Sequence, residues 1–170
     1  MRSILIIITI LLLVGVSFSQ SSKIEDGWRG LRVFVMNKDS VDQILGKPLS
    51  IRDTYWTTYY TSEARVEINF TSKPCSSAQG EKGDFDVPEN TILEFAVLPK
   101  QPFPIKDLIW SREKYEILPG REPYIKNYYD SKSGIGVTTS EEHGTEMVGQ
   151  IFFRAPVREK AKRRCNNKLR

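Results

Sequence analysis

Apolar and polar residues follow a helical period in one short segment near the start of the chain. Val41, Ile44 and Leu45 stand at positions i, i+3 and i+4, which places them on one face of a helix. Asn37 or Asp39 can cap the free amide groups at the start of this helix, and a Gly-Lys-Pro sequence ends it. One short helix is not stable alone in water, so its apolar face must pack against another element.

Beyond this helix the period changes to two, which is typical of β-strands. In residues 65–70, Val66, Ile68 and Phe70 alternate with polar residues and are expected to face the core. Short turns between neighbouring strands favour antiparallel pairing. The sequence thus predicts an α+β fold, with an antiparallel sheet of about five to six strands and one or two short helices packed on one face. Further strands are predicted at residues 55–60, 91–98, 124–130, 135–139 and 147–154.

The first nineteen residues have the pattern of a secretory signal peptide. A short positive start at residues 1–3 precedes an unbroken apolar run at residues 4–14, and small residues follow it. The alternative is an uncleaved anchor helix, but the apolar stretch is short for crossing ~30 Å of hydrocarbon. We therefore expect a signal peptide over residues 1–19, a secreted or periplasmic protein, and no stable membrane insertion after cleavage.

The rest of the chain is expected to form a single globular α+β domain over residues 20–157 and a basic C-terminal tail over residues 158–170. Because exported proteins meet an oxidising environment, Cys75 and Cys165 are predicted to form a disulfide rather than two free thiols. Closing so long a loop stabilises the folded chain by about 4 to 5 kcal/mol in the chain-entropy model. The bond would also fasten the tail to the domain.

Positive charge is concentrated in the tail. The formal net charge is +4, and residues 158–170 hold seven Lys or Arg and one Glu. Such a run is either a solvated extension or an electrostatic contact to an anionic polymer, lipid headgroups or nucleic acid. The tail has no aromatic residues that stack on bases, so no specific nucleic acid is expected as a partner.

Motifs that carry chemistry are missing from the sequence. A structural zinc site usually needs four Cys or His ligands, and the chain has two Cys and one His, His143. We find no Gly-x-Ser-x-Gly elbow and no glycine-rich phosphate loop. No catalytic residue, no metal site and no cofactor is therefore predicted. Whether the chain is an enzyme stays open, and a non-enzymatic role is favoured.

Aromatic residues gather in one predicted strand. In a strand, Tyr55 and Tyr59 lie on one face and Trp56 and Tyr60 on the other, so a half-buried sheet leaves one pair exposed. Two alternatives are that a helix or loop covers the second face, or that the stretch is helical. Phe152 poses the same question, because Ile151 and Phe153 follow the opposite alternation. Exposed aromatic residues concentrate at binding surfaces, so the candidate binding residues are Tyr55, Trp56, Tyr59, Tyr60 and Phe152.

Two stretches resemble known families. Residues 38–48, a capped helix that ends in Leu-Gly-Lys-Pro, resemble the short helix of the BamE/SmpA-like small outer-membrane assembly lipoproteins. Residues 28–31, 85–92 and 97–100 resemble a group of uncharacterised exported bacterial proteins. These resemblances imply a sheet covered by helices in domains that bind other proteins. The chain has no cysteine after the predicted signal for lipidation, so membrane tethering and outer-membrane assembly do not carry over, and neither do functional residues.

Taken together, the sequence predicts an interaction domain that binds protein or an anionic envelope polymer. The contact is expected on an aromatic sheet face, with assistance from the basic tail. The alternative is a small-ligand-binding protein or a hydrolase, in which carboxylates and His143 converge only in three dimensions.

Overall fold

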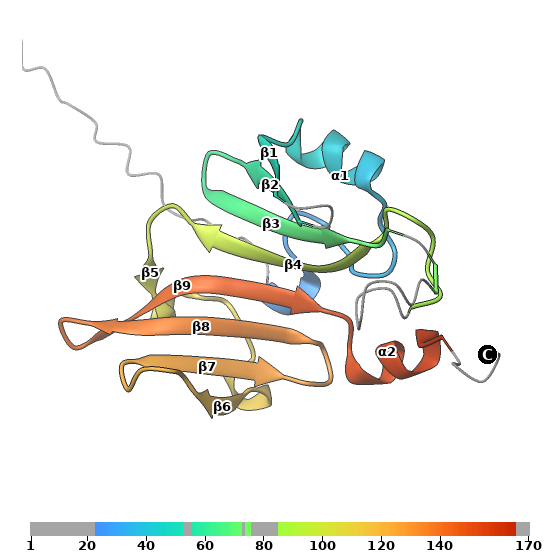
Figure 1. Cartoon of the computed structure of the whole chain (residues 1–170). Helices are drawn as coiled ribbons and strands as arrows, with labels where there is room; N and C mark the ends of the chain where they lie inside the picture. Colours follow the sequence, from blue (N-terminus) through green and yellow to red (C-terminus); the bar gives the residue numbers. More distant parts are fainter. Residues whose placement is uncertain (1–22, 53–55, 73, 76–84, 166–170) are drawn as a thin grey trace, which may run out of the picture.

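A computed structural model describes residues 23–52, 56–72, 74–75 and 85–165 of the chain (Figure 1). The predicted signal peptide over residues 1–19, the candidate residue Tyr55 and residues 166–170 of the basic tail lie outside the described residues. No helix within the described ranges is long and apolar enough to cross a membrane.

The strands form one antiparallel sheet of nine strands, which confirms the α+β class. The strand order is β1-β2-β3-β4-β9-β8-β7-β6, and β5 pairs with β9. The predicted five to six strands were too few, because β1, β5 and β6 have only two to four residues each and show no alternation. The elements are η1 (Ile24–Asp26), α1 (Lys38–Leu45), β1 (Ser50–Arg52), β2 (Trp56–Tyr60), β3 (Ala64–Phe70), β4 (Ile92–Pro99), β5 (Phe103–Pro104), η3 (Ile105–Asp107), η4 (Arg112–Lys114), β6 (Glu116–Pro119), β7 (Ile125–Asp130), β8 (Ile135–Glu142), β9 (Thr145–Arg154) and α2 (Val157–Arg163).

Helix α1 forms where the sequence predicts it. The Asn37 side chain accepts a hydrogen bond from the Ser40 amide at 3.0 Å, and Gly46 closes the helix with φ 84°. The Tyr59 hydroxyl of β2 donates to Asp42 Oδ1 at 2.6 Å, which ties the helix to the sheet. Burial raises the pKa of the Asp42 carboxyl, but hydrogen bonds from Lys38 and Tyr59 outweigh it and hold this pKa below its ordinary value.

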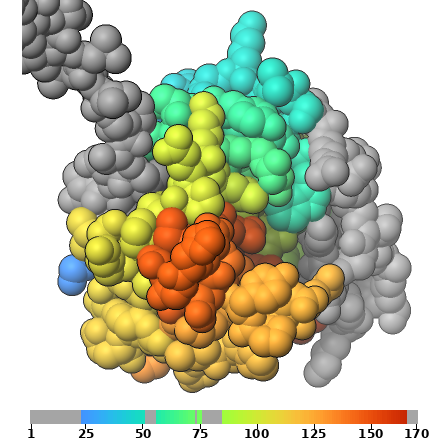
Figure 2. Space-filling view, turned by 90° about the vertical axis from the view of Figure 1, so that its left-hand side faces the viewer, coloured from blue at the N-terminus to red at the C-terminus, as the bar shows by residue number. Residues whose placement is uncertain are grey.

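One face of the sheet carries the hydrophobic core. Val66, Ile68 and Phe70 are buried, as their alternation predicts, and the rings of Phe95 and Phe153 stack with centroids 4.4 Å apart. The N-terminal segment covers this face through apolar side chains such as Leu31. Figure 2 looks at the hairpin end of the sheet, with the β8–β9 hairpin (orange) projecting toward the viewer and the N-terminal segment (blue) to one side.

The predicted disulfide between Cys75 and Cys165 is present. Helix α2 lies beyond the ends of β7, β8 and β9 (Figure 1), so the first part of the basic segment is helical. The Asp86 amide donates to the Arg163 carbonyl at 2.7 Å, which attaches the end of α2 to the chain before β4. The disulfide and this hydrogen bond therefore hold α2 against one end of the sheet.

Candidate binding surface on the outer sheet face

The face of the sheet opposite the core, which we call the outer face, is turned toward the viewer in Figure 1. Successive side chains of a strand point to opposite faces, and the strand register aligns the outer positions into rows across the sheet. The pairing between β2, β3, β4, β9, β8 and β7 places the following residues on the outer face: Trp56, Asn69, Glu94, Ala96, Gln150, Phe152, Arg154, Gly136, Thr138, Asn127 and Tyr129.

An aromatic pair occupies the middle of this face. Phe152 of β9 and Tyr129 of β7 each pair with Gly136 of β8, and their rings stack with centroids 5.9 Å apart and an interplanar angle of 22°. The Arg154 guanidinium lies 5.0 Å from the Phe152 ring centroid, a distance suited to a cation–π interaction. A Cβ atom on Gly136 would lie 1.9 Å from Phe152 Cζ, so this aromatic platform requires glycine at residue 136.

Polar side chains form the next row of the outer face. Gln150, Thr138 and Asn127 stand side by side on β9, β8 and β7. The Thr138 hydroxyl donates to Asn127 Oδ1 at 2.9 Å, while the Gln150 amide makes no hydrogen bond within the described residues. The platform therefore has hydrogen-bonding groups along one side.

A charged network borders the platform on its other side. Arg154 Nε donates to Glu94 Oε2 at 2.9 Å, and Asn69 Nδ2 donates to Glu94 Oε1 at 3.3 Å. Asn69 is only 1 % exposed, and its Oδ1 atom is buried without a hydrogen-bond partner among the described residues. Buried polar atoms are nearly always paired, so this unsatisfied acceptor needs an explanation.

Two hollows open on this surface. One, of about 210 Å³, lies beside Phe152 of the platform and is lined by residues that include Trp56, Gln150 and Phe152. The other, of about 540 Å³, runs between the sheet and α2. Glu94 and Arg154 line both hollows, so the two hollows adjoin each other at this ion pair.

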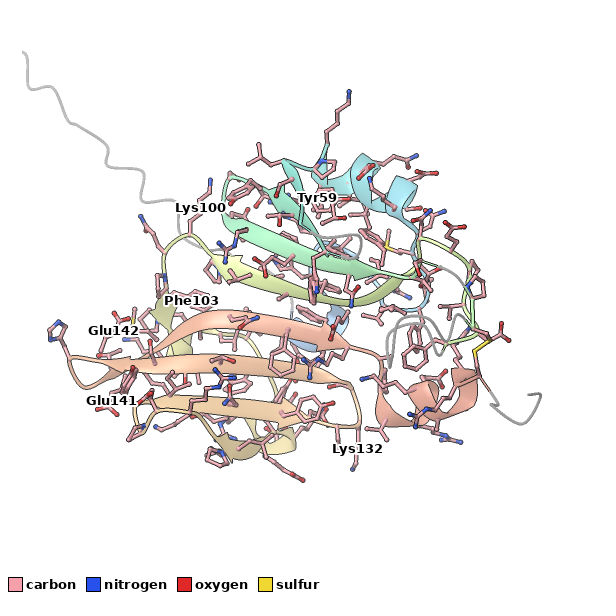
Figure 3. All side chains as sticks on the ribbon, in the orientation of Figure 1. Tyr59, Lys100, Phe103, Lys132, Glu141 and Glu142 are labelled. Carbon is pink, nitrogen blue, oxygen red and sulfur yellow. A yellow bond between two sulfur atoms is a disulfide. The ribbon has the colours of Figure 1, made fainter. Side chains whose placement is uncertain are left out.

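The structure separates the predicted binding residues. Tyr59 is 0 % exposed and belongs to the core, because its ring points toward α1 (Figure 3); it is therefore no part of a binding surface. Tyr60 is 50 % exposed but does not line either hollow, whereas Trp56 and Phe152 both line the smaller one.

Sequence reasoning missed the other members of the surface. Gln150 and Arg154 share the alternation of Phe152 in β9, so that pattern already places them on its side of the strand. Tyr129, Glu94 and Asn69 come from three other strands, and only the register brings them next to Phe152 and Arg154.

Within the described ranges no three His, Cys, Asp or Glu side chains are placed to hold a metal ion. His143 lies in the exposed turn between β8 and β9. Glu146 is the acceptor for the Tyr128 and Thr139 hydroxyls, each at 2.6 Å. Burial raises the pKa of Glu146, but these hydrogen bonds and the Lys126 charge outweigh it and lower this pKa, so Glu146 stays ionised.

Comparison with known proteins adds no identity: no family model, no curated protein and no solved structure matches this chain. The resemblances to the assembly lipoproteins and to the exported bacterial proteins therefore stay predictions.

Proposed function

We propose that this protein is a secreted or periplasmic binding module whose outer sheet face holds a polymer of sugar units. The stacked pair of Phe152 and Tyr129 carries this proposal, because it forms a half-buried aromatic platform beside the Gln150 amide, which makes no hydrogen bond among the described residues. Sugar rings have C–H faces that pack on the negative face of an aromatic ring, and hydroxyls that bond to amides. The Cys75–Cys165 disulfide fits an oxidising compartment.

The polar row favours a sugar polymer over a protein. The centre of a stable protein interface is depleted of charged groups. Here the Arg154–Glu94 ion pair directly adjoins the platform, and the free amide of Gln150 lies on its other side. These groups match the alternating apolar faces and hydroxyls of a glycan chain better than they match an apolar protein surface.

The carboxylates of this face do not favour the hydrolase alternative. Glycoside hydrolysis usually needs one protonated carboxyl group as a general acid. Glu94 is ion-paired with Arg154 at 2.9 Å and Glu67 with Arg65 at 3.3 Å, so both carboxyl groups are already engaged by a guanidinium within the protein.

Affinity electrophoresis in gels that contain hydroxyethyl cellulose, alginate or polygalacturonate tests this function. At least one polymer is expected to retard the wild-type protein, and Phe152→Ala should weaken the retardation about tenfold, which corresponds to ~1.4 kcal/mol of lost binding free energy. Tyr124→Ala is the matched control, because Tyr124 is exposed but lines neither hollow.

Two results would contradict the proposal. The first is equal mobility in all gels, with and without polymer. The second is a Phe152→Ala variant that loses a co-purifying protein while its mobility in every gel stays that of the wild type, which would identify the outer face as a protein interface.

A further inference from the structure

The larger hollow, which we call the α2 groove, has a basic wall and an apolar floor. Helix α2 and the residue after it provide the wall, and the chain before β4 and β4 itself provide much of the floor. The outer-face network closes the other side through Arg154 and Glu94. The wall carries Lys160 and Arg164, and the floor carries Phe34, Phe85 and Leu93.

Among the described residues, part of the positive charge in this groove is uncompensated. Arg154 is paired with Glu94, but Lys160 and Arg164 form no ion pair with any described residue. The acidic residues Glu141 and Glu142 lie at the tip of the β8–β9 hairpin, at the opposite end of the sheet from α2 (Figure 3). An anionic group is therefore attracted to the α2 end of the outer face.

Asn69 adds an independent sign of a ligand in the same groove. Its Nδ2 donates to Glu94 Oε1, which fixes the orientation of the amide and leaves Oδ1 as the unsatisfied acceptor. A buried carbonyl oxygen without a donor destabilises the folded protein. Asn69 lines the groove, so a donor that completes its hydrogen bonding is expected on the groove side.

We propose that the α2 groove binds an acidic sugar residue of the polymer, of the uronic-acid type. The carboxylate lies between Lys160 and Arg164, whose planar guanidinium matches the geometry of a carboxylate, and a ring hydroxyl donates to Asn69 Oδ1. Because Glu94 and Arg154 line both hollows, the neighbouring sugar residue stacks on Phe152. This inference rests on the proposed function and adds the charge of the polymer to it.

Calorimetric titration with oligogalacturonate and with its full methyl ester tests the role of the groove. The two probes share one backbone, and only the first has carboxylates. We expect the acid to bind about tenfold more tightly than the ester, with Lys160→Gln abolishing most of this difference. Lys162→Gln is the matched control, since it removes the same charge from α2 at a residue that pairs with Glu159 and does not line the groove. The affinity of this variant for oligogalacturonate should equal that of the wild type.

A second variant separates a ligand role of Asn69 from a structural one. Asn69→Leu removes the unsatisfied acceptor, so the melting temperature should stay equal or rise while the affinity for oligogalacturonate falls about tenfold. A lower melting temperature with unchanged affinity would show that Asn69 is structural and would overturn its role in the groove.

The remaining outcomes distinguish the two proposals. Equal affinity for acid and ester, with both lost in Phe152→Ala, overturns the acidic specificity and leaves the sugar-binding function intact. Binding of neither probe, together with no retardation in any polymer gel, overturns both. Equal losses in Lys160→Gln and Lys162→Gln mean a diffuse electrostatic attraction and overturn the groove as the site.

Discussion

Phe152 and Phe153 are neighbours in β9 and serve opposite faces of the same sheet. Phe153 is 4 % exposed and stacks on Phe95 inside the core. Phe152 is half-buried, lies over Gly136 and contacts Tyr129 and the Arg154 cation. Because adjacent residues of a strand point to opposite faces, the Phe153 ring stabilises the core while the Phe152 ring stays available to a ligand.

Two polar networks, one on each face, differ in how completely their atoms are paired. On the core face, Glu146 accepts hydrogen bonds from Tyr128, Thr139 and Lys126, which leaves this network closed. On the outer face, Asn69 has a buried acceptor without a donor. The Glu146 network is complete within the protein, whereas the Asn69 acceptor has no donor among the described residues.

The largest expected effect concerns the disulfide that holds α2. The bond joins residues 90 positions apart, so its loss in Cys75→Ala/Cys165→Ala should cost about 4 to 5 kcal/mol and lower the melting temperature by roughly 10 °C or more. Scanning calorimetry of the wild type and the double variant measures this effect. An unchanged melting temperature would show that α2 is held without the bond.

The two phenylalanines give the next effect and the sharpest contrast in stability. Phe153→Ala should destabilise the protein by about 3 to 5 kcal/mol, since it leaves a cavity in the core. Phe152→Ala should cost about 1 kcal/mol or less, because its ring is half-exposed. Urea unfolding of both variants checks the contrast, and equal losses of free energy would remove the distinction between the faces.

Glu146→Gln tests the hydrogen-bond network around Glu146 on the core face. It should lower the free energy of unfolding by about 2 kcal/mol near neutral pH, because the charge-assisted hydrogen bonds from Tyr128 and Thr139 are lost. The folded pKa of Glu146 lies below its ordinary value of 4.5, so this contribution to stability is present above pH 4.5 and is lost as the pH falls through the lowered pKa. The variant should therefore lose part of the acid limb of a stability–pH profile, measured by urea unfolding.

Glu141→Gln is the control for that profile, because Glu141 lies at the exposed hairpin tip. The idea fails if both variants show the same acid limb as the wild type.

Gly136→Ala should have a modest effect on stability and a clear effect on binding. The new Cβ meets the end of the Phe152 ring, a flexible group that can swing away, so the cost should be about 1 to 2 kcal/mol. The displaced ring no longer stacks on Tyr129, so retardation in polymer gels should fall as it does in Phe152→Ala. Undiminished retardation would show that the stacked geometry is irrelevant to binding.

Local patterns predicted much of the fold. The stripe of Val41, Ile44 and Leu45 marked α1, alternation marked β3 and β9, and the two cysteines marked the disulfide. Strands β1, β5 and β6 were not predicted, because a segment of two to four residues is too short to show an alternation of apolar and polar residues. The face taken by Tyr59 depends on α1 packing against β2, a contact that the sequence of β2 alone does not contain.

The binding surface was harder to predict, for a reason that its residues make plain. Asn69, Glu94 and Arg154 come from three strands and meet through pairing between β3, β4 and β9. The register of the β3–β4 pairing also shifts between Asn69 and Phe70, next to the point where Asn69 pairs with Glu94. Non-local register is invisible to periodicity, so only Trp56 and Phe152 could be selected in advance.

The most direct test of the outer face is a ¹H–¹⁵N spectrum of the labelled protein during titration with oligogalacturonate. The side-chain amides of Asn69, Asn127 and Gln150 report on the outer face, and the indole of Trp110, which packs edge-on against Tyr128, reports on the core face. The three amide signals should shift progressively while the Trp110 indole signal stays in place. Shifts of the Trp110 signal without shifts of the amides, or no shift at saturating oligosaccharide, would contradict the account.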